Sequence, residues 1–460
     1  MSEEEKLSSY LSKSKLISNS NYEKKIRIAI LGGFTLNGLE ETMRVKCDEK
    51  KIQCTTFVSG YNQYNQEILD EKSQLYKFSP DITFLIIDSR NTLGEFFLNP
   101  YSISAEERKR FVEDKSNEII NLAKELVKKS KSKLVISNFN IPSYSPIGIS
   151  ETKEEFGLHD MIRSLNQNIK IGLSLEPEII IYDLNSFITA FGEQKVFSYK
   201  QFFYGDIRIS LDCIPYLADE LIGYVTAVLG LSKKCIVLDL DNTLWGGIVG
   251  EDGFEGIKLG DDPVGRSYVE FQHNLLALNQ RGILLAINSK NNFDDAIQVI
   301  KDHPNMVLKE DNFACVRINW NDKVVNMKEI SDELNIGLDS MVFVDDDPAN
   351  IEYVSSNLPE ISSIHMSAEQ CHNNSRSIRS ISSFFNVLKI TDEDKTRNKM
   401  YLEQRKRSEL KTQVGNLDEF LKQMGISVHI KNADDFTIPR ISQLTLKTNQ
   451  FNLTTRRYQE

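Results

Sequence analysis

Two aspartates, Asp239 and Asp241, stand one residue apart at the end of a short, mainly apolar segment, residues 234–238. A glycine-rich stretch, residues 246–250, follows them. A short apolar run is typical of a buried parallel strand, and the turn after such a strand presents its side chains at the edge of the sheet. Two carboxylates in this position could serve as a nucleophile and as a general acid and base.

Further polar residues follow other predicted strands. Ser289 comes shortly after one apolar segment, and Asp345 and Asp346 end another. Lys323 begins the predicted helix that leads into the second of these strands. Because the carboxyl ends of parallel strands meet at one edge of a sheet, we expect these side chains to share a pocket with the aspartate pair.

Four carboxylates in one pocket need a counter-charge. A like-charged pair about 4 Å apart costs roughly 4 kcal/mol at an effective dielectric constant near 20, so either the pKa values rise or a cation lies among the carboxylates. Ligands that are all oxygen atoms favour Mg²⁺ over zinc. The choice between Asp345 and Asp346 as the direct ligand stays open. The expected metal ligands are Asp239, Asp241, Asp345 and Asp346.

A cation, a lysine and a hydroxyl group form a suitable site for a phosphoryl group. Lys323 would neutralise the phosphoryl oxygens, Ser289 would donate a hydrogen bond, and Asp239 would attack phosphorus. Asp241 would protonate the leaving oxygen and later activate the water that hydrolyses the aspartyl-phosphate. The sequence therefore predicts Asp239 and Asp241 as the catalytic residues.

These residues, in this order, resemble the four motifs of the haloacid dehalogenase (HAD) phosphohydrolase superfamily. The motifs correspond to 239–243, Ser289, Lys323 and 345–346. The resemblance implies a phosphatase core without a cap domain, in which Thr243, Ser289 and Lys323 bind phosphate. Asp347, which directly precedes a proline, is expected to cap the following helix.

Longer segments closely resemble the FkbH-like proteins, a subfamily IIIC group of the HAD superfamily. The segments are 239–253, 319–323, 343–348 and 448–458. This resemblance implies a Mg²⁺-dependent enzyme that dephosphorylates a three-carbon metabolite, 1,3-bisphosphoglycerate, and loads the glyceryl unit onto the phosphopantetheine thiol of an acyl carrier protein. It also implies an acyl or pantetheine pocket at Asn449, Asn452 and Arg456.

The sequence departs from the FkbH-like pattern in two respects. Relatives usually continue past the motif at 448–452 into an acetyltransferase-like (GNAT-type) domain, whereas this sequence ends shortly after it. Many relatives have Cys before the motif serine, where this chain has Asn288, and Cys235 in its apolar strand is expected to be a packed thiol. Two alternatives therefore stay open: a plain small-molecule phosphatase without acyl transfer, and a non-catalytic module that binds a carrier protein.

The first half of the chain also alternates apolar strands with helices, which predicts a three-layer α/β domain over 25–228. Its order of segments resembles an SGNH-hydrolase-type domain, with Thr35 near the nucleophilic serine and Asn138 near the asparagine of that family. The stretch 206–209 lacks the histidine of the family pattern. Without a base a hydroxyl is a poor nucleophile, so a binding or scaffolding role is expected here.

The complete prediction is an α/β protein with two three-layer parallel-sheet (Rossmann-like) domains, the second a capless HAD-like fold, and a small α+β C-terminal segment. The HAD-like domain is expected over 229–365. Residues 1–24 are expected to be a mobile leader, the Ser/Asn-rich residues 366–390 a linker, and 391–460 a partial GNAT-like segment.

Composition restricts the partners. The 460 residues carry a net charge of -11, which argues against a nucleic-acid-binding surface. No apolar run approaches the roughly 18–20 residues of a membrane helix, and the six cysteines contain no CxxC pair that would indicate a zinc site or a disulfide framework. We expect a cytoplasmic protein whose partners are a phosphorylated metabolite and an acyl carrier protein, with no nucleic acid and no membrane.

Overall fold

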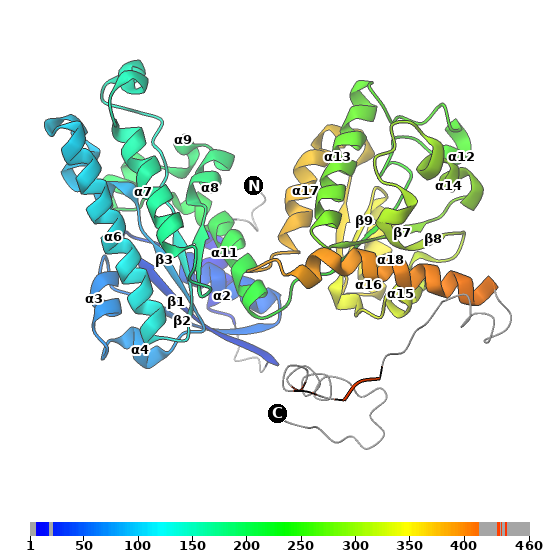
Figure 1. Ribbon diagram of the computed structural model, residues 1–460, viewed down its shortest axis with the longest axis horizontal. Coiled ribbons are helices and arrows are strands. Elements are labelled where there is room, and N and C mark those ends of the chain that lie inside the picture. Colours follow the sequence, from blue (N-terminus) through cyan, green and yellow to red (C-terminus); the bar gives the residue numbers. More distant parts are fainter. Residues whose placement is uncertain (1–5, 18–21, 414–429, 433, 435–437, 439–460) are drawn as a thin grey trace. The chain divides into compact units, whose positions relative to one another are not determined.

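The computed structural model describes residues 6–17, 22–413, 430–432, 434 and 438 (Figure 1). The chain divides into two compact units, 1–398 and 399–460. The first unit contains two five-stranded sheets, and every strand pair in both is parallel. The predicted α/β class with two parallel-sheet domains is therefore confirmed.

The first sheet has the order β2-β1-β3-β4-β5. Its strands are β1 (Lys24–Gly32), β2 (Ile52–Val58), β3 (Ile82–Ile86), β4 (Lys133–Ser137) and β5 (Ile179–Tyr182). After β1 the chain adds β2 on one side and then crosses to add β3 on the other. The point between β1 and β3 is thus the topological switch point, where ligands bind in open α/β sheets.

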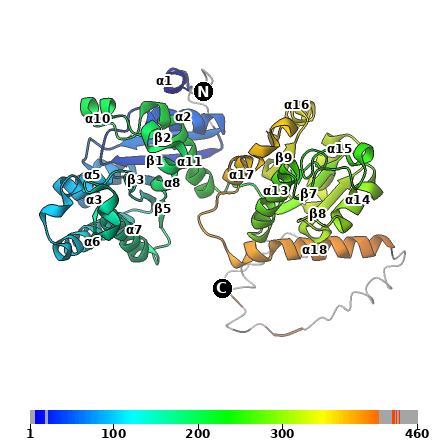
Figure 2. The same cartoon turned by 90° about the horizontal axis from the view of Figure 1, so that it is seen from above.

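Helices cover both faces of this sheet, as Figures 1 and 2 show. Side chains alternate along a strand, so Ile28 of β1 faces one apolar core whereas Ala29 faces the other. One core includes α2 (Leu39–Glu49), α8 (Leu184–Phe191) and α11 (Ile214–Val228). The other includes α3 (Tyr64–Leu69), α4 (Gln74–Phe78), α6 (Ala105–Lys129) and α7 (Leu158–Leu173).

The second sheet has the order β10-β9-β6-β7-β8, so β6 lies in its centre. Its strands are β6 (Cys235–Leu238), β7 (Leu284–Ser289), β8 (Phe313–Ile318), β9 (Met341–Asp345) and β10 (Ser362–His365). The chain leaves β6 for β7 on one side and returns to β9 on the other. The switch point therefore lies between β6 and β9, at the end of the apolar segment that carries the aspartate pair.

Each of four helices in this domain begins directly after an Asp or Asn whose side chain accepts a hydrogen bond from a backbone amide of the first turn. They are α13 (Pro263–Gln280) after Asp262, α14 (Phe293–Asp302) after Asn292, α15 (Lys323–Leu334) after Asp322 and α16 (Pro348–Asn357) after Asp347. The prediction that Asp347 caps a helix is confirmed. Because Asn292, Asp322 and Asp347 each follow a strand within a few residues, these caps fix loops at the carboxyl edge of the sheet.

The predicted linker is corrected by the structure. Residues 374–383 form α17 (Asn374–Ser383), and both Ile381 and Phe385 are buried in the core of the second domain. Ser and Asn dominate the composition of this stretch, but its few apolar residues recur at helical spacing and so make one face that packs against α13. Short apolar stripes of this kind are hidden by a composition-based reading.

The expected mobile leader also differs from the structure. Residues 7–14 form α1 (Leu7–Ser14), which packs against α2. Tyr10 is buried, and its hydroxyl lies 3.2 Å from Nζ of Lys46 on α2. One aromatic anchor thus orders a segment whose composition is otherwise polar.

The remaining helices are short, apart from one. They are α5 (Ser89–Leu93), α9 (Glu193–Val196), α10 (Tyr199–Gly205), α12 (Val249–Asp252) and α18 (Asp392–Gln413).

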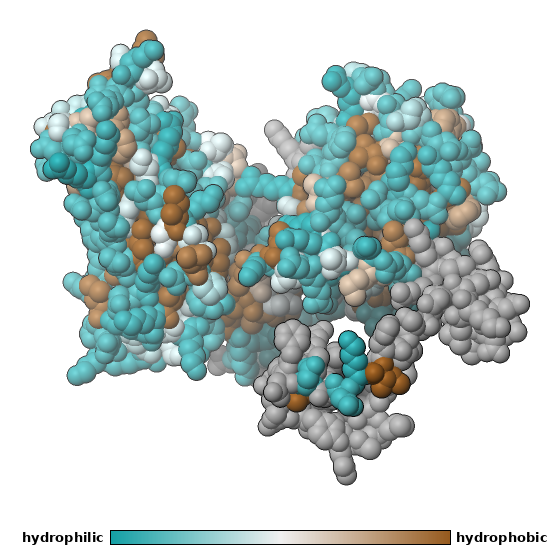
Figure 3. All heavy atoms as spheres, in the orientation of Figure 1, coloured by the Kyte–Doolittle hydropathy of each residue, from teal (hydrophilic) through white to brown (hydrophobic). Residues whose placement is uncertain are grey.

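The predicted GNAT-like segment beyond α18 lies almost wholly outside the described residues. In the view of Figure 3 the surfaces of the α/β domains are mainly hydrophilic, with apolar residues in small groups. No helix in the described part of the chain has the length and apolar character needed to cross a membrane.

Candidate active site

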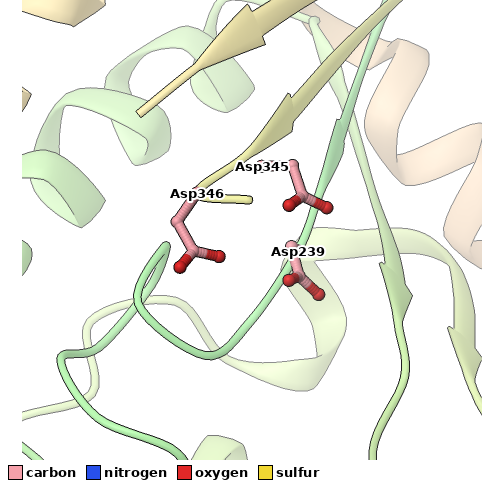
Figure 4. A group of neighbouring side chains, drawn as sticks. All are labelled: Asp239, Asp345 and Asp346. Atoms are coloured by element: carbon pink, nitrogen blue, oxygen red, sulfur yellow. The ribbon is translucent and has the colours of Figure 1, made fainter. Parts of the chain in front are cut away.

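Three carboxylates meet at the switch point of the second sheet (Figure 4). Leu238 of β6 pairs with Val344 of β9, so the residues that follow them, Asp239 and Asp345, are neighbours. Asp346 comes next along the chain. One carboxylate oxygen from each of the three aspartates lies within 4.8 Å of the others. We call Asp239, Asp345 and Asp346 the carboxylate cluster.

Lys323 lies against this cluster. Its Nζ is 3.0 Å from Oδ1 of Asp239 and 2.5 Å from Oδ2 of Asp345, and its side chain is only 2% exposed. Burial disfavours the ammonium group, but the two aspartates outweigh it and raise the pKa of Lys323. The lysine is therefore held as a cation in a site that solvent hardly reaches.

One lysine does not balance three carboxylates. Burial raises the pKa of Asp239, and Asp345 adds to the rise, whereas Lys323 and a hydrogen bond from Ser289 oppose it. Burial, followed by the charges of Asp239 and Asp345, raises the pKa of Asp346 to about 7. The cluster therefore has an excess of negative charge, and its donors are all oxygen atoms. This donor set fits a hard divalent cation such as Mg²⁺.

Asp345 and Asp346 have different surroundings. Asp345 is completely buried, and its carboxylate accepts hydrogen bonds from Lys323, from the backbone amide of Asp347 at 2.9 Å and from Nδ2 of Asn350 at 3.2 Å. Asp346 is partly exposed and faces Asp239 across the cluster (Figure 4). The arrangement indicates that Asp345 positions the lysine, whereas Asp346 is the carboxylate better placed to bind a cation.

The side chain of Asp241 does not belong to the carboxylate cluster, and its predicted place among the metal ligands stays a prediction. Its Oδ1 accepts hydrogen bonds from Nε1 of Trp245 at 2.8 Å and from the amide of Val249 at 3.1 Å. Its Oδ2 accepts one from Nδ2 of Asn291 at 2.8 Å. Burial nevertheless raises the pKa of Asp241, against the effect of these donors. A carboxyl group with a raised pKa is suited to proton transfer, the role predicted for this residue.

The other predicted residues differ in whether the structure places them at the site. Ser289, at the end of β7, is buried, and its hydroxyl lowers the pKa of Asp239, so it joins the site. Thr243 is fully buried, and its Oγ1 has no hydrogen-bond partner among the residues that the structure describes. Its role in phosphate binding stays a prediction. The expected acyl or pantetheine pocket lies outside the described residues; it comprises Asn449, Asn452 and Arg456.

A group of asparagines behind the site was missed by the sequence reasoning. Nδ2 of Asn288 donates to the backbone carbonyl of Lys323 at 3.0 Å, and its Oδ1 accepts from Nδ2 of Asn326 at 3.0 Å. Asn326 in turn donates to Oδ1 of Asn319 at 3.0 Å. This network attaches the start of α15 to β7 and so fixes the lysine. The only signal in the sequence was the departure at Asn288 itself.

The connection between β6 and α13 spans residues 239–262 and includes α12. Gly246 and Lys258 form an antiparallel bridge that closes it, and Gly247, with φ of 92°, allows the turn. The buried Trp245 packs this turn from below and holds Asp241 through its indole N–H. A connection of this size is too small for a separate domain at this position, as expected for a capless core.

In the first domain, Thr35 and Asn138, the residues of the SGNH resemblance, have other partners. The backbone amide of Thr35 donates to the carbonyl of Asp206 at 3.2 Å, whereas the amide group of Asn138 donates to Oδ1 of Asp183 at 2.7 Å. Ile209, at the position where the SGNH pattern has histidine, is buried in the core. The geometry favours the binding or scaffolding role.

Comparison with known proteins bears on both domains. Residues 27–226 match the family model described as FkbH, N-terminal domain. The crystal structure of the N-terminal part of the protein BF1531 from Bacteroides fragilis contains a phosphatase domain complexed with Mg. It matches with a TM-score of 0.76 and 26% sequence identity, over 84% of this chain and 99% of that chain. The first domain therefore matches the FkbH N-terminal family model, and the chain is similar to a solved protein that contains a Mg-bound phosphatase domain.

Two other solved structures match with TM-scores too low to support an argument. LAE5, an α/β hydrolase from the metagenome of Lake Arreo, Spain, has a TM-score of 0.27 and 9% identity over 45% of this chain and 95% of its own. BT4096, a gut microbial diltiazem-metabolizing enzyme, has a TM-score of 0.31 and 12% identity over 48% of this chain and 51% of its own. The comparison with curated proteins gave no match.

The buried lysine gives the first testable prediction. Lys323→Met leaves Asp239 and Asp345 buried without their cation, so we expect the free energy of unfolding, measured by urea titration at pH 7, to fall by about 3–5 kcal/mol. Adding Asp345→Asn removes one unpaired charge and should recover part of the loss. The exposed Lys290→Met is the control and should change the value by no more than about 0.5 kcal/mol. Equal stability of the Lys323 and Lys290 variants would contradict this account.

Proposed function

We propose that the HAD-type domain hydrolyses a phosphate ester or anhydride with Mg²⁺ and with Asp239 as the nucleophile. The observation that carries this proposal is the buried Asp239, which lies 3.0 Å from Lys323 and within the carboxylate cluster. A cluster of carboxylates beside one lysine at a switch point suits a phosphoryl group together with a divalent cation. The phosphatase domain of BF1531, a similar protein, is complexed with Mg.

Asp239 and Asp346 would hold the Mg²⁺, while Asp345 keeps Lys323 in place. The bound cation supplies positive charge that offsets the phosphoryl oxygens. Lys323, whose Nζ lies 3.0 Å from Oδ1 of Asp239, adds a second positive charge, and Ser289 would add a hydrogen-bond donor. These residues together favour the charge distribution of the transition state over that of the free substrate.

The two aspartates of the central motif divide the chemistry. A carboxylate oxygen of Asp239 forms a bond to phosphorus as the bond from phosphorus to the leaving oxygen breaks, and Asp241 gives its proton to that oxygen. Asp241 then accepts a proton from the water that attacks the aspartyl-phosphate, which releases phosphate and restores Asp239. The hydrogen bonds from Trp245 and Asn291 hold Asp241 in one orientation for both steps.

We further propose that the substrate is a phosphorylated three-carbon acyl compound, 1,3-bisphosphoglycerate, and that the glyceryl unit passes to the phosphopantetheine thiol of an acyl carrier protein. The thiol sulfur forms a bond to the C1 carbonyl carbon as the bond from that carbon to its phosphate breaks and the thiol loses its proton, while Asp239 removes the phosphate ester at C3, so the carrier keeps a glyceryl thioester. The family resemblance of the motifs supports this substrate. Exposed apolar side chains of this domain would offer the carrier protein a contact surface. They are Ile248, Phe293 and Trp320, which are 40%, 50% and 76% exposed.

One observation favours a second candidate, a phosphatase without acyl transfer. Asn288 occupies the position before the motif serine, so that position offers no thiol for an acyl intermediate. Cys235 is completely buried in β6, and burial raises the pKa of its thiol, which makes it a packed side chain and not a nucleophile. A plain phosphatase would release phosphate at a rate that does not depend on any carrier.

The two candidates are separated by one assay. The protein is incubated with 1,3-bisphosphoglycerate, Mg²⁺ and a phosphopantetheinylated carrier, while phosphate release and the intact mass of the carrier are measured. Transfer predicts a carrier heavier by one glyceryl unit, whereas phosphate release without a gain in carrier mass supports the plain phosphatase. Asp239→Asn should lower turnover by at least about a thousandfold, and the exposed Asp261→Asn should leave it unchanged. Full turnover by the Asp239 variant would contradict both candidates.

The pKa of Asp346 predicts how metal binding depends on pH. Near pH 7 this carboxyl group is half protonated in the metal-free protein, so Mg²⁺ must displace a proton at lower pH. We expect the Kd for Mg²⁺ to be about tenfold higher at pH 6 than at pH 8, with about one proton released per ion at pH 6. Calorimetry in two buffers of different ionisation enthalpy measures both quantities.

The adjacent residue provides the control for that experiment. Asp347→Asn keeps a side chain that can cap α16, so its pH dependence should match that of the wild type. Asp346→Asn should weaken binding and abolish the pH dependence between pH 6 and pH 8. Affinity that does not change with pH in the wild type would contradict the placement of Asp346 at the cation.

A further inference from the structure

The first domain contains a cavity of about 250 Å³ that the phosphatase chemistry does not use. Much of its wall consists of apolar and aromatic side chains, while one end is polar. The apolar part includes Phe34, Phe97, Leu158, Leu184, Ile188 and Val196. The polar end includes Asp88, Ser89 and Arg208.

The cavity lies at the switch point of the first sheet. Phe34 comes just after β1 and Asp88 just after β3, and these two strands are neighbours in the sheet. The chain continues from β1 to β2 on one side of this point and from β3 to β4 on the other. Ligands of open α/β sheets bind in this position, outside the carboxyl ends of the strands. Thr35, which the SGNH resemblance places near the position of the nucleophilic serine, lines a different hollow beside β2. The position therefore indicates a binding site and not a hydrolase centre.

Arg208 provides an unused donor at the polar end. Its side chain is 9% exposed; Nη2 lies 2.7 Å from Oδ1 of Asp206 and 2.9 Å from Oδ1 of Asn91, and Nη1 lies 3.1 Å from Oδ2 of Asp88. The guanidinium group also lies over the ring of Phe202 at 4.4 Å. Its buried Nε has no hydrogen-bond partner among the residues that the structure describes. Buried donors are nearly always paired, so this one points to a ligand that supplies an acceptor.

The charges around the cavity do not favour an anion. Asp88 and Asp206 already balance Arg208, and Glu193 adds a further negative charge at the wall. Arg90, also in the wall, supplies one positive charge, and its guanidinium group stacks on aromatic rings. With no excess of positive charge, the site has little to offset the desolvation of an anionic ligand. A neutral ligand fits better.

We propose that this cavity binds a small, mainly apolar carboxamide, whose carbonyl oxygen accepts from Nε of Arg208 and whose N–H donates to Asp88. A carboxamide presents an acceptor and a donor side by side, which matches the adjacent arginine and carboxylate. The volume equals roughly eight water molecules at about 30 Å³ each, so one aromatic ring or a short chain fills the apolar part. The binding needs no covalent step.

The proposal is tested with the full-length protein and N-ethylbenzamide as the probe, by calorimetry or by saturation-transfer NMR. We expect saturable binding of the amide and about tenfold weaker binding of ethyl benzoate, which has the same shape but no N–H. Benzoate, an anion, should also bind at least about tenfold more weakly than the amide. Absence of saturable binding, or tighter binding of either comparison compound, would overturn the proposal.

Two substitutions on α8 locate the site. Ile188→Trp fills the cavity and should weaken binding of the amide at least about tenfold, whereas Thr189→Trp adds the same side chain to the exposed face and should leave it unchanged. If Ile188→Trp does not fold, Tyr199→Ala at the exposed wall replaces it and should weaken binding about threefold through the lost ring contact. Unchanged binding in the variant that folds would show that the amide binds elsewhere.

Discussion

The site in the second domain depends on one buried interaction, the ammonium group of Lys323 between Asp239 and Asp345. Removing charges from water is costly, so such a group persists only where the surrounding structure fixes every partner. Here the register of β6 and β9 places the two aspartates side by side, and the cap by Asp322 starts α15 at the lysine. The hydrogen bond from Asn288 to the lysine carbonyl connects that helix to the sheet. The same elements place Asp346 beside these aspartates, so the carboxylate cluster has an excess of negative charge, which a divalent cation would offset.

The two domains repeat one architectural solution with different chemistry. Each sheet has polar side chains at its switch point, where the connections that leave two neighbouring strands run to opposite sides of the sheet. In the second domain these side chains are carboxylates with one lysine, which suits a phosphoryl group and its cation. In the first domain they are one arginine with two carboxylates beside an apolar cavity, which suits a neutral ligand. A shared fold therefore does not imply a shared function.

The sequence was sufficient to predict the site residues that stand at strand ends and at the start of α15. Asp239, Ser289, Lys323 and the pair 345–346 could be predicted because their positions follow from the strand and helix pattern alone. The orientation of Asp241 could not be predicted, since its partners come from loops whose course depends on packing. The role of Asn288 was hidden for the same reason.

Two expectations about chain organisation failed because they relied on composition. The leader and the linker are rich in polar residues, yet Tyr10 in the first and Phe385 in the second are buried. A single apolar anchor on a short helix can offset the entropy of ordering several polar residues. Average composition does not reveal such anchors.

The central claim is that Asp239 attacks phosphorus, and its most direct test is to trap the covalent intermediate. The Asp241→Asn variant, mixed with substrate and Mg²⁺ and then quenched in acid, should accumulate an aspartyl-phosphate because the base for its hydrolysis is missing. Peptide mass spectrometry should place the phosphoryl group on Asp239, and hydroxylamine should remove it. A phosphoryl group on Ser289, or phosphate release by this variant through a path that never labels Asp239, would contradict the account.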